Sequence, residues 1–367
     1  MRFSMKKTIV HYWQISLWKA KLFLATALAL IIVFLCEHHL LAQNTSFHFE
    51  GHVIQPGEVK SLILPVVTEK QDSTYIPITI INGLSKGPVL GLIAGIHGYE
   101  YPPILAMQKL SGEIDPKDVH GTILIVRLAN VDAFFGRSVF YHPKDGKNLN
   151  RQFPGSKSGT ITEVLAYTIS QKIILRCQYV VDIHAGDASE DLHPYIAIYE
   201  YGTQTAKAKQ MALALDFPWL ITSENAPKQG QPTIYCTAEA VSKDIPVVGI
   251  EYGKLGQVRP EEADFINKRL RNMMRSLGIL SGKPVAVNTP IEIGKRSSIK
   301  SEQTGIFYTD YRSGTLFKKG VKLGFVTDLF GNVIQEIWAP FDGFIIYVSF
   351  TPPINKGETL LSISELD

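Results

Sequence analysis

The chain has 367 residues, of which 45% are apolar, 19% charged and 10% aromatic. This length and composition allow one large core and a smaller second core, and they exclude wholesale disorder. Residues 1–42 hold five basic residues and one acidic residue, so the formal charge of +3 becomes −1 for the rest of the chain. This balance gives no electrostatic basis for a nucleic-acid partner.

Residues 1–42 have the pattern of an export signal. A basic lead precedes fifteen uncharged, mostly apolar residues from Leu22 to Cys36. That run matches the apolar part of a signal peptide and is shorter than the roughly 20 residues that span a bilayer. We expect cleavage after Ala42 and export to the periplasm or the medium. The alternative is an uncleaved N-terminal anchor, which would be the protein's only contact with a membrane.

Residues 43–285 are predicted to form an α/β domain. Two short strands, at 61–67 and 76–81, come first, and from about residue 86 to 280 apolar strands alternate with helical stretches. The expected helices cover residues 102–110, 161–177, 206–215 and 261–277. Such alternation favours a mixed central sheet flanked by helices. Residues 282–301 have the composition of a polar linker.

Residues 286–367 are predicted to form a small C-terminal β domain, because they show no helical period and many glycine turns. Residues 317–323 and 354–360 repeat one pattern of strand, Lys-Gly turn and strand. Two such copies favour a small β barrel or sandwich packed beside the first domain. Cys177 precedes a predicted strand, so we expect a buried free thiol there; no cysteine is needed for a metal site.

Four polar landmarks follow four apolar runs of the α/β region. His97 and Glu100 come after residues 89–96, Asn130 after 122–129, His184 after 179–183 and Glu251 after 246–250. Runs of this length with β-branched residues are typical of buried strands. Because functional groups collect at the carboxyl ends of the strands in open α/β sheets, we expect these side chains to converge on one pocket.

His97, Glu100 and His184 are the candidate ligands of one zinc ion. Two imidazoles and a carboxylate with a vacant fourth position are typical of catalytic zinc, which acidifies a bound water. Asp182 either orients one of these ligands or forms a structural pair at the strand edge.

Glu251 is the candidate general base. A carboxylate at the end of an apolar strand is costly to bury unless it is paired or functional. Beside a metal-activated water it can accept a proton and return it to a leaving amine. The alternative is a carboxylate that is merely paired at the strand end.

Residues 145–155 are the candidate substrate-binding segment, since they are turn-rich and too polar for a core. They contain Asn148, Asn150 and Arg151. The planar guanidinium of arginine matches a carboxylate with two parallel hydrogen bonds, so Arg151 points to a substrate with a free carboxylate. Arg137 is a further candidate, with a surface charge as the alternative.

Together these residues resemble the succinylglutamate desuccinylase/aspartoacylase family, a branch of the zinc carboxypeptidase-like hydrolases. The resemblance runs from about residue 91 to 256. Four ordered motifs carry it: His97-Gly-Tyr-Glu100, Asn148-Leu-Asn-Arg-Gln-Phe-Pro-Gly155, Asp182-Ile-His184 and Gly249-Ile-Glu-Tyr-Gly253. It implies a zinc-carboxypeptidase-like fold with a C-terminal β domain. It also implies zinc on His97, Glu100 and His184, catalysis by Glu251, and substrate contacts from Asn150 and Arg151.

The chain departs from this family at one substrate-binding position. Members similar to aspartoacylase carry a further arginine nine residues after the asparagine that matches Asn130, where this chain has Val139. Either Arg137 replaces it or the pocket does not recognise an aspartate-like acid. For the tyrosine that some members contribute from the C-terminal domain, Tyr308 and Tyr311 are the candidates. An export signal also departs from the cytosolic members.

The leading hypothesis is a zinc-dependent deacylase that hydrolyses the amide bond of an N-acyl amino acid or a similar small carboxylate. The first alternative is an exported zinc carboxypeptidase acting on peptides or cell-wall peptides. The second is a zinc-binding pseudoenzyme that works as an envelope interaction module. The expected partner is therefore a small carboxylate or a short peptide, and no pattern in the sequence indicates an oligomeric state.

Overall fold

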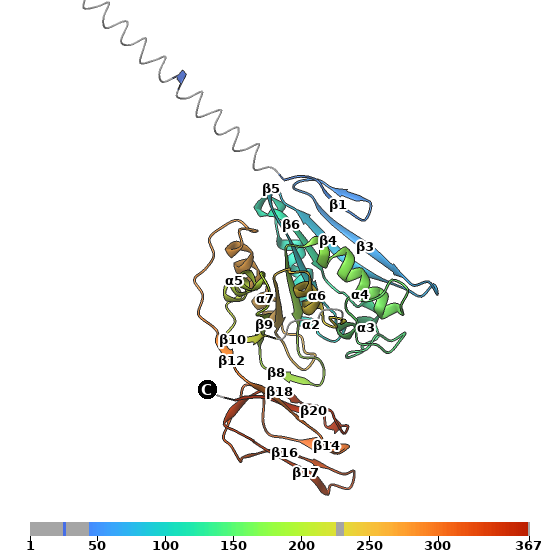
Figure 1. Ribbon diagram of the computed structural model, residues 1–367, viewed down its shortest axis with the longest axis vertical. Coiled ribbons are helices and arrows are strands. Elements are labelled where there is room, and N and C mark those ends of the chain that lie inside the picture. The colour runs from blue at the N-terminus through green and yellow to red at the C-terminus, as the bar shows by residue number, and fades with distance from the viewer. Residues whose placement is uncertain (1–24, 27–43, 225–230, 366–367) are drawn as a thin grey trace, which may run out of the picture.

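The computed structural model describes residues 25–26, 44–224 and 231–365. Residues 44–224 and 231–365 form an α/β domain and a smaller β domain below it (Figure 1). The expected cleavage site after Ala42, and all of the leader except Ala25 and Thr26, lie outside the described residues. Among the residues that are described, no helix combines the length and the apolar character needed to cross a bilayer.

A nine-stranded mixed sheet forms the centre of the α/β domain, as the sequence predicted. Its strands lie in the order β12-β10-β9-β11-β7-β5-β6-β4-β3. Strands β6, β5, β7 and β11 run parallel to one another, whereas β3, β4 and β9 pair antiparallel with their neighbours β4, β6 and β11. The bounds are β3 Val59–Val67, β4 Ser73–Asn82, β5 Ser85–Ala94, β6 His120–Val126, β7 Tyr179–His184, β9 Tyr195–Tyr199, β10 Trp219–Ser223, β11 Val247–Glu251 and β12 Ile291–Ile293. A separate hairpin joins β1 Phe47–Phe49 and β2 His52–Ile54.

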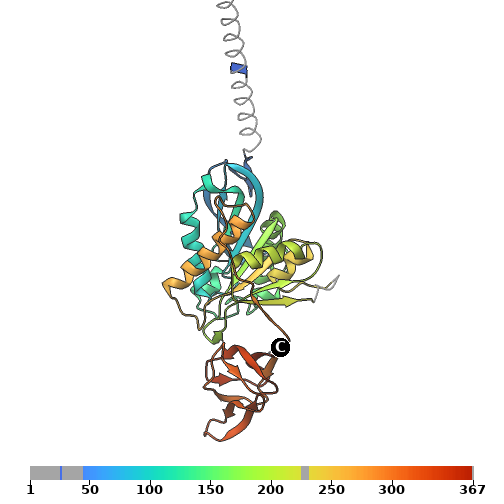
Figure 2. The ribbon, with the colours of Figure 1, turned by 90° about the vertical axis from the view of Figure 1, so that its left-hand side faces the viewer.

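Helices cover both faces of this sheet and create two core layers (Figures 1 and 2). One layer packs the sheet against α2 Tyr101–Glu113, α5 Thr205–Leu215 and α7 Pro260–Ser276. The other packs it against α4 Ile161–Lys172 and α6 Cys236–Ser242. The remaining helical segments are α3 Val131–Phe135 and the short turns η1 Pro116–Asp118, η2 Leu149–Arg151 and η3 Ile174–Arg176. Cys177 and Cys236 are free thiols buried in the second layer, as expected for Cys177.

Two elements end earlier than the sequence suggested, each for a local reason. The helix expected over 161–177 ends at Lys172, because Ile173 leaves helical geometry (φ −117°, ψ −65°) and a short 3₁₀ turn follows. Strand β5 stops at Ala94, because Gly95 has a φ of +70° and turns the chain. That backbone conformation is open mainly to glycine.

The C-terminal domain is a two-sheet sandwich, one of the two predicted architectures. The first sheet holds β13 Arg296–Lys300, β20 Thr359–Glu365, β18 Gly343–Ser349 and β15 Leu316–Phe317. The second holds β17 Val333–Trp338, β16 Lys322–Thr327, β14 Gly305–Tyr308 and β19 Pro353–Ile354. Both sheets contribute to one apolar core. Over the described residues they do not close into a barrel.

The repeated Lys-Gly pattern is where the chain crosses between the two sheets of the sandwich. The first copy leads from β15 to β16 and the second from β19 to β20, and each pair joins a strand of one sheet to a strand of the other. Gly320 and Gly357, with φ of +79° and +91°, make the two crossings.

Two short strands connect the sandwich to the α/β domain. Strand β12 lies within the segment expected to be a linker, yet it pairs in parallel with β10 and extends the central sheet. Strand β8, Glu190–Leu192, follows β7 and pairs antiparallel with β18 of the sandwich. The segment after His184 is therefore held from both domains.

Candidate active site

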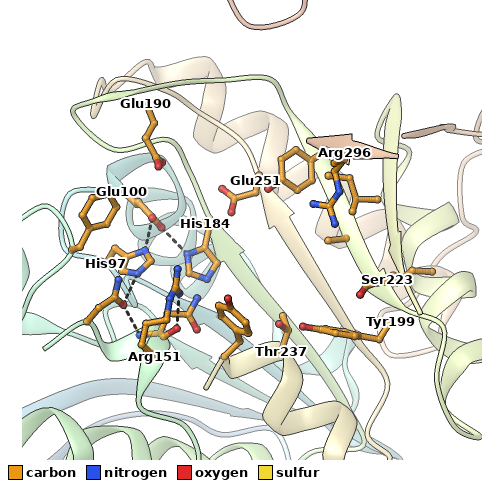
Figure 3. Close-up of a pocket in the computed structure, with 18 residues that line it drawn as sticks. His97, Glu100, Arg151, His184, Glu190, Tyr199, Ser223, Thr237, Glu251 and Arg296 are labelled. Carbon is orange, nitrogen blue, oxygen red and sulfur yellow. Dashed lines mark hydrogen bonds and ion pairs between the residues drawn. The ribbon is translucent and has the colours of Figure 1, made fainter. Parts of the chain in front are cut away.

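His97, Glu100 and His184 lie together at the carboxyl ends of two adjacent strands (Figure 3). His97 follows β5, Glu100 immediately precedes α2, and His184 is the last residue of β7. The Nδ1 atoms of His97 and His184 lie 2.6 and 2.9 Å from the two carboxylate oxygens of Glu100. All three side chains are buried, and their donor atoms lie within 4.8 Å of one another. The ends of β5 and β7 therefore bring these three side chains together, as the sequence predicted.

The turn that carries His97 and Glu100 is shaped by close packing against α3. A Cβ at Gly98 would lie 2.3 Å from the backbone carbon of Ala133, so only glycine fits there. Asn130 begins α3, and its side chain accepts a hydrogen bond from the Ala133 amide at 3.2 Å. Asn130 therefore supports this turn. It does not line the pocket, contrary to the expectation from the sequence.

Two further side chains hold the imidazoles in place. The Asn148 side-chain oxygen lies 3.1 Å from Nε2 of His97. An Asp182 carboxylate oxygen lies 3.1 Å from Nε2 of His184. A polar partner on the second ring nitrogen is the usual arrangement around a metal-binding histidine. The position of Asp182 matches the orienting role, since this carboxylate is buried and faces the ring rather than solvent.

The electrostatics of the cluster suit a divalent cation. Burial alone would raise the pKa of Glu100, but His97 and His184 lower it to about 2, so the group is a carboxylate. Burial opposes protonation of His184, yet Asp182 and Glu100 raise its pKa well above the ordinary range. One carboxylate oxygen each of Asp182 and Asp187 is buried without a hydrogen-bond partner. Two imidazoles and a carboxylate amid this excess of acid are a donor set that zinc accepts.

Glu251 stands beside the cluster as the last residue of β11. It pairs in register with His184 on one side and with Tyr195 on the other. Burial raises the pKa of Glu251 to about 8; the charge of His184 opposes this shift and that of Glu100 adds to it. A carboxyl group that titrates near neutrality can both accept and donate a proton at the working pH.

These groups open into one cavity of about 480 Å³, which Asn150 and Arg151 also line (Figure 3). The Asn150 side-chain oxygen accepts a hydrogen bond from the Cys236 amide at 2.9 Å, which anchors the segment to α6. Arg151 donates to the Asn150 carbonyl at 2.7 Å, and its guanidinium lies 4.7 Å from the centre of the Tyr235 ring. Both residues are thus brought to the pocket.

The structure does not bring Arg137 to this cavity. Arg137 is exposed, has a φ of +50° in the loop after α3, and is absent from the pocket wall. The two tyrosine candidates also lie elsewhere: Tyr308 stacks on Phe325 and Tyr311 packs against the sandwich core.

Several pocket residues were missed by the sequence reasoning. They are Glu190 from β8, Tyr195 and Tyr199 from β9, Ser223 from β10, Thr237 from α6 and Arg296 from β13. Burial and the charges of Asp187 and Glu251 raise the pKa of Glu190 well above the ordinary range. One signal was available: Tyr195 and Tyr199 alternate with apolar residues, which places them on the same face of a strand.

Comparisons with known proteins identify the family and support the fold. Residues 86–277 match the succinylglutamate desuccinylase/aspartoacylase catalytic domain. The N-alpha-acetyl-L-2,4-diaminobutyric acid deacetylase of Halomonas elongata is 28% identical over 88% of this chain and 95% of its own length.

Two solved structures carry the same fold over nearly their whole length. A succinylglutamate desuccinylase from Silicibacter sp. TM1040 is 26% identical, with a TM-score of 0.74 over 85% of this chain and 96% of its own. The product-bound ectoine utilization protein EutE (DoeB) from Ruegeria pomeroyi is 25% identical, with a TM-score of 0.75 over 88% and 99% of the two chains.

Fold and site together define a hydrolase of the zinc-carboxypeptidase-like architecture. The chain belongs to the succinylglutamate desuccinylase/aspartoacylase family, whose members are deacylases, and it is an enzyme.

Proposed function

We propose that this protein is a zinc-dependent deacylase that hydrolyses the amide bond of an N-acyl amino acid or a similar small carboxylate. One observation carries the proposal: a buried His97–Glu100–His184 cluster shares a single cavity with Glu251 and Arg151. The name of the Halomonas relative, an N-acetyl amino acid deacetylase, supports the same reaction class.

The proposed reaction assigns each side chain one task. A zinc ion held by His97, Glu100 and His184 would lower the pKa of a bound water towards about 7 and polarise the scissile carbonyl. Glu251 takes the proton of the attacking water and delivers it to the leaving amine. Arg151, which lines the cavity, binds the carboxylate of the substrate through two parallel hydrogen bonds.

Asn148 and Asp182 keep the two imidazoles oriented through contacts of 3.1 Å each. The Phe140 ring packs at nearly a right angle to the His97 ring, with ring centres 5.8 Å apart.

The second candidate function is an exported carboxypeptidase for peptides or cell-wall peptides. The export pattern of residues 1–42 favours it, and the same zinc chemistry and carboxylate-binding arginine would serve it. The intact set of His97, Glu100, His184 and Glu251 disfavours a pseudoenzyme. We also propose export of the protein, to be tested by cell fractionation and by mass spectrometry of the mature N-terminus. Protein retained in the cytosol would contradict export.

The reaction is tested with purified zinc-loaded protein on three substrate sets: N-acyl amino acids, dipeptides and murein fragments. We expect hydrolysis of the first set, loss of activity with a chelator and recovery with zinc. His184→Ala should abolish both activity and zinc binding, whereas His48→Ala, at an exposed position of β1, should leave both unchanged. Hydrolysis restricted to peptides would favour the carboxypeptidase, and hydrolysis of none of the three would reject the proposal.

A further inference from the structure

Arg296 brings a second guanidinium into the pocket, and it comes from the C-terminal sandwich. It is the first residue of β13, pairs in register with Ser364 of β20, and lies three residues beyond the end of β12. Figure 3 shows it on the far side of Glu251 from His97, with its guanidinium turned towards the cavity. The pocket therefore has an arginine at each end, Arg151 and Arg296.

Arg296 is exposed, and none of the described acidic residues forms an ion pair with its guanidinium. Over the described residues it forms no hydrogen bond and no ion pair, whereas Arg151 donates to a backbone carbonyl and packs on Tyr235. Its charge acts on Tyr195 and Tyr199: it opposes the burial that raises the pKa of both phenols. The exposed cation therefore lines the pocket without an ion pair to any of the described carboxyl groups.

The cavity that Arg296 lines also carries hydroxyl groups. Tyr199, Ser223 and Thr237 present hydroxyl groups from β9, β10 and α6 (Figure 3). Among the acidic residues of the cavity, Glu251 is assigned to proton transfer and Glu100 to the metal in the proposed reaction. Hydroxyl donors around an unpaired guanidinium are a site for a carboxylate, since each can donate a hydrogen bond to it.

We propose that Arg296 is a specificity-determining residue that binds an anionic group at the end of the substrate remote from Arg151. This inference rests on the proposed deacylase function. It predicts preference for substrates with a second negative charge and discrimination against a cationic side chain, such as that of the diaminobutyric acid derivative named for the Halomonas relative. Like-charge repulsion excludes the wrong substrate as effectively as attraction selects the right one.

The second negative charge can come from either half of the substrate. It can be a side-chain carboxylate of the amino acid or a carboxylate at the end of the acyl group. Two pairs of substrates separate these sources: Nα-acetylaspartate against Nα-acetylasparagine, and Nα-succinylalanine against Nα-butyrylalanine. Nα-acetyl-2,4-diaminobutyrate supplies the cationic side chain.

The experiment measures kcat/KM for these five substrates with the full-length, zinc-loaded protein and its variants. In the wild type we expect the anionic member of at least one pair to be preferred. Arg296→Gln should reduce that preference by roughly tenfold to a hundredfold, the value of a charge-assisted hydrogen bond. Arg296→Glu should shift the preference towards the diaminobutyrate substrate, and Arg296→Lys should keep most of the original order. The substrate pair whose preference is lost in Arg296→Gln shows whether the second negative charge lies on the amino acid or on the acyl group.

Lys295→Gln is the matched control, because it removes the same charge one residue away and Lys295 does not line the cavity. It should leave all ratios unchanged, and thermal melting should give similar midpoints for all variants. If Arg296→Gln changes kcat/KM for anionic, neutral and cationic substrates by one common factor, Arg296 is only structural and the proposal is overturned.

Failure of the deacylase proposal is recognised separately. If the wild type hydrolyses none of the substrates, calorimetric titration with aspartate, succinate and 2,4-diaminobutyrate still tests Arg296. Preferred binding of an anion that is lost in Arg296→Gln supports the anionic site, and equal binding by both proteins rejects it.

Discussion

Glu251 and His184 occupy paired positions at the carboxyl ends of the parallel strands β11 and β7. Strands in a sheet lie about 4.8 Å apart, so backbone hydrogen bonding alone places a carboxyl group beside a candidate zinc ligand. The buried strands of the sheet, and not a mobile loop, therefore determine where the candidate base stands relative to His184. A rigid backbone of this kind preserves the site when one side chain is changed, which makes conservative substitutions informative.

Glu251→Gln is expected to lower kcat by about 10²–10⁴-fold while zinc content stays at one ion per chain, because loss of a general base affects proton transfer and not the ligands. Steady-state kinetics and elemental analysis of the purified variant check this. Glu262→Gln, on α7 and outside the pocket wall, is the control and should retain normal turnover. Near-normal kcat in Glu251→Gln would remove this residue from the mechanism.

Asn148→Ala is expected to weaken zinc binding by about 10–100-fold, because an outer partner of a metal-binding imidazole is lost. The Asn148 oxygen lies 3.1 Å from Nε2 of His97 and accepts from the Asn150 amide at 2.8 Å. Asn148→Asp keeps an acceptor oxygen for both contacts and should bind zinc more tightly than the alanine variant. Competition with a chelating dye measures the affinities. Equal affinities in Asn148→Ala and the wild type would show that this contact does not tune the metal site.

Arg151→Gln and Arg137→Gln form a matched pair that removes the same charge from two positions. Arg151 lines the cavity and Arg137 does not. We expect Arg151→Gln to raise KM by roughly 10–100-fold, the value of hydrogen bonds to a charged group, and Arg137→Gln to leave KM nearly unchanged. Initial-rate measurements over a range of substrate concentrations distinguish them. A larger effect from Arg137 would restore it as the replacement for the arginine missing at position 139.

The metal-free protein should lose stability as the pH rises through the pKa of Glu251. In the folded chain this pKa is raised from 4.5 to about 8, so between these values the folded state holds a proton that the unfolded state releases. The stabilisation is complete below about pH 4.5 and is lost as the pH passes 8. In the presence of a chelator, thermal melting of Glu251→Gln should fall less steeply than that of the wild type from pH 5 to 8. Parallel curves would contradict the raised pKa.

The sequence identified the side chains that follow long apolar strands. Glu100, His184 and Glu251 were identified because each follows an apolar run typical of a buried strand. Their spacing also matches the motifs of the family. Asn150 and Arg151 were found because a polar, turn-rich segment between apolar stretches stands out. The mixed sheet and the helices on its two faces followed from the same alternation.

Arg296 and Glu190 could not be found in this way. Their strands, β13 and β8, are short and polar, and they form because β20 and β18 supply hydrogen-bond partners distant in sequence. Strand β12 was mistaken for part of a linker for the same reason: three residues carry no periodic pattern, and only pairing with β10 makes them a strand. Arg137 was proposed for the pocket because of its distance in sequence from Asn130. That distance could not reveal that the backbone of Arg137 adopts a left-handed conformation.

The pairing of β8 with β18 connects the C-terminal sandwich to the segment that follows His184. The Phe350 amide donates to the Ser189 carbonyl at 2.7 Å, and the Ser313 hydroxyl donates to Asp191 at 2.8 Å. Truncation near residue 285 would remove these hydrogen bonds to the segment that follows His184. It would also delete β12, an edge strand of the central sheet. The two halves should therefore melt as one cooperative unit, and a change in the sandwich can alter catalysis without touching a single ligand.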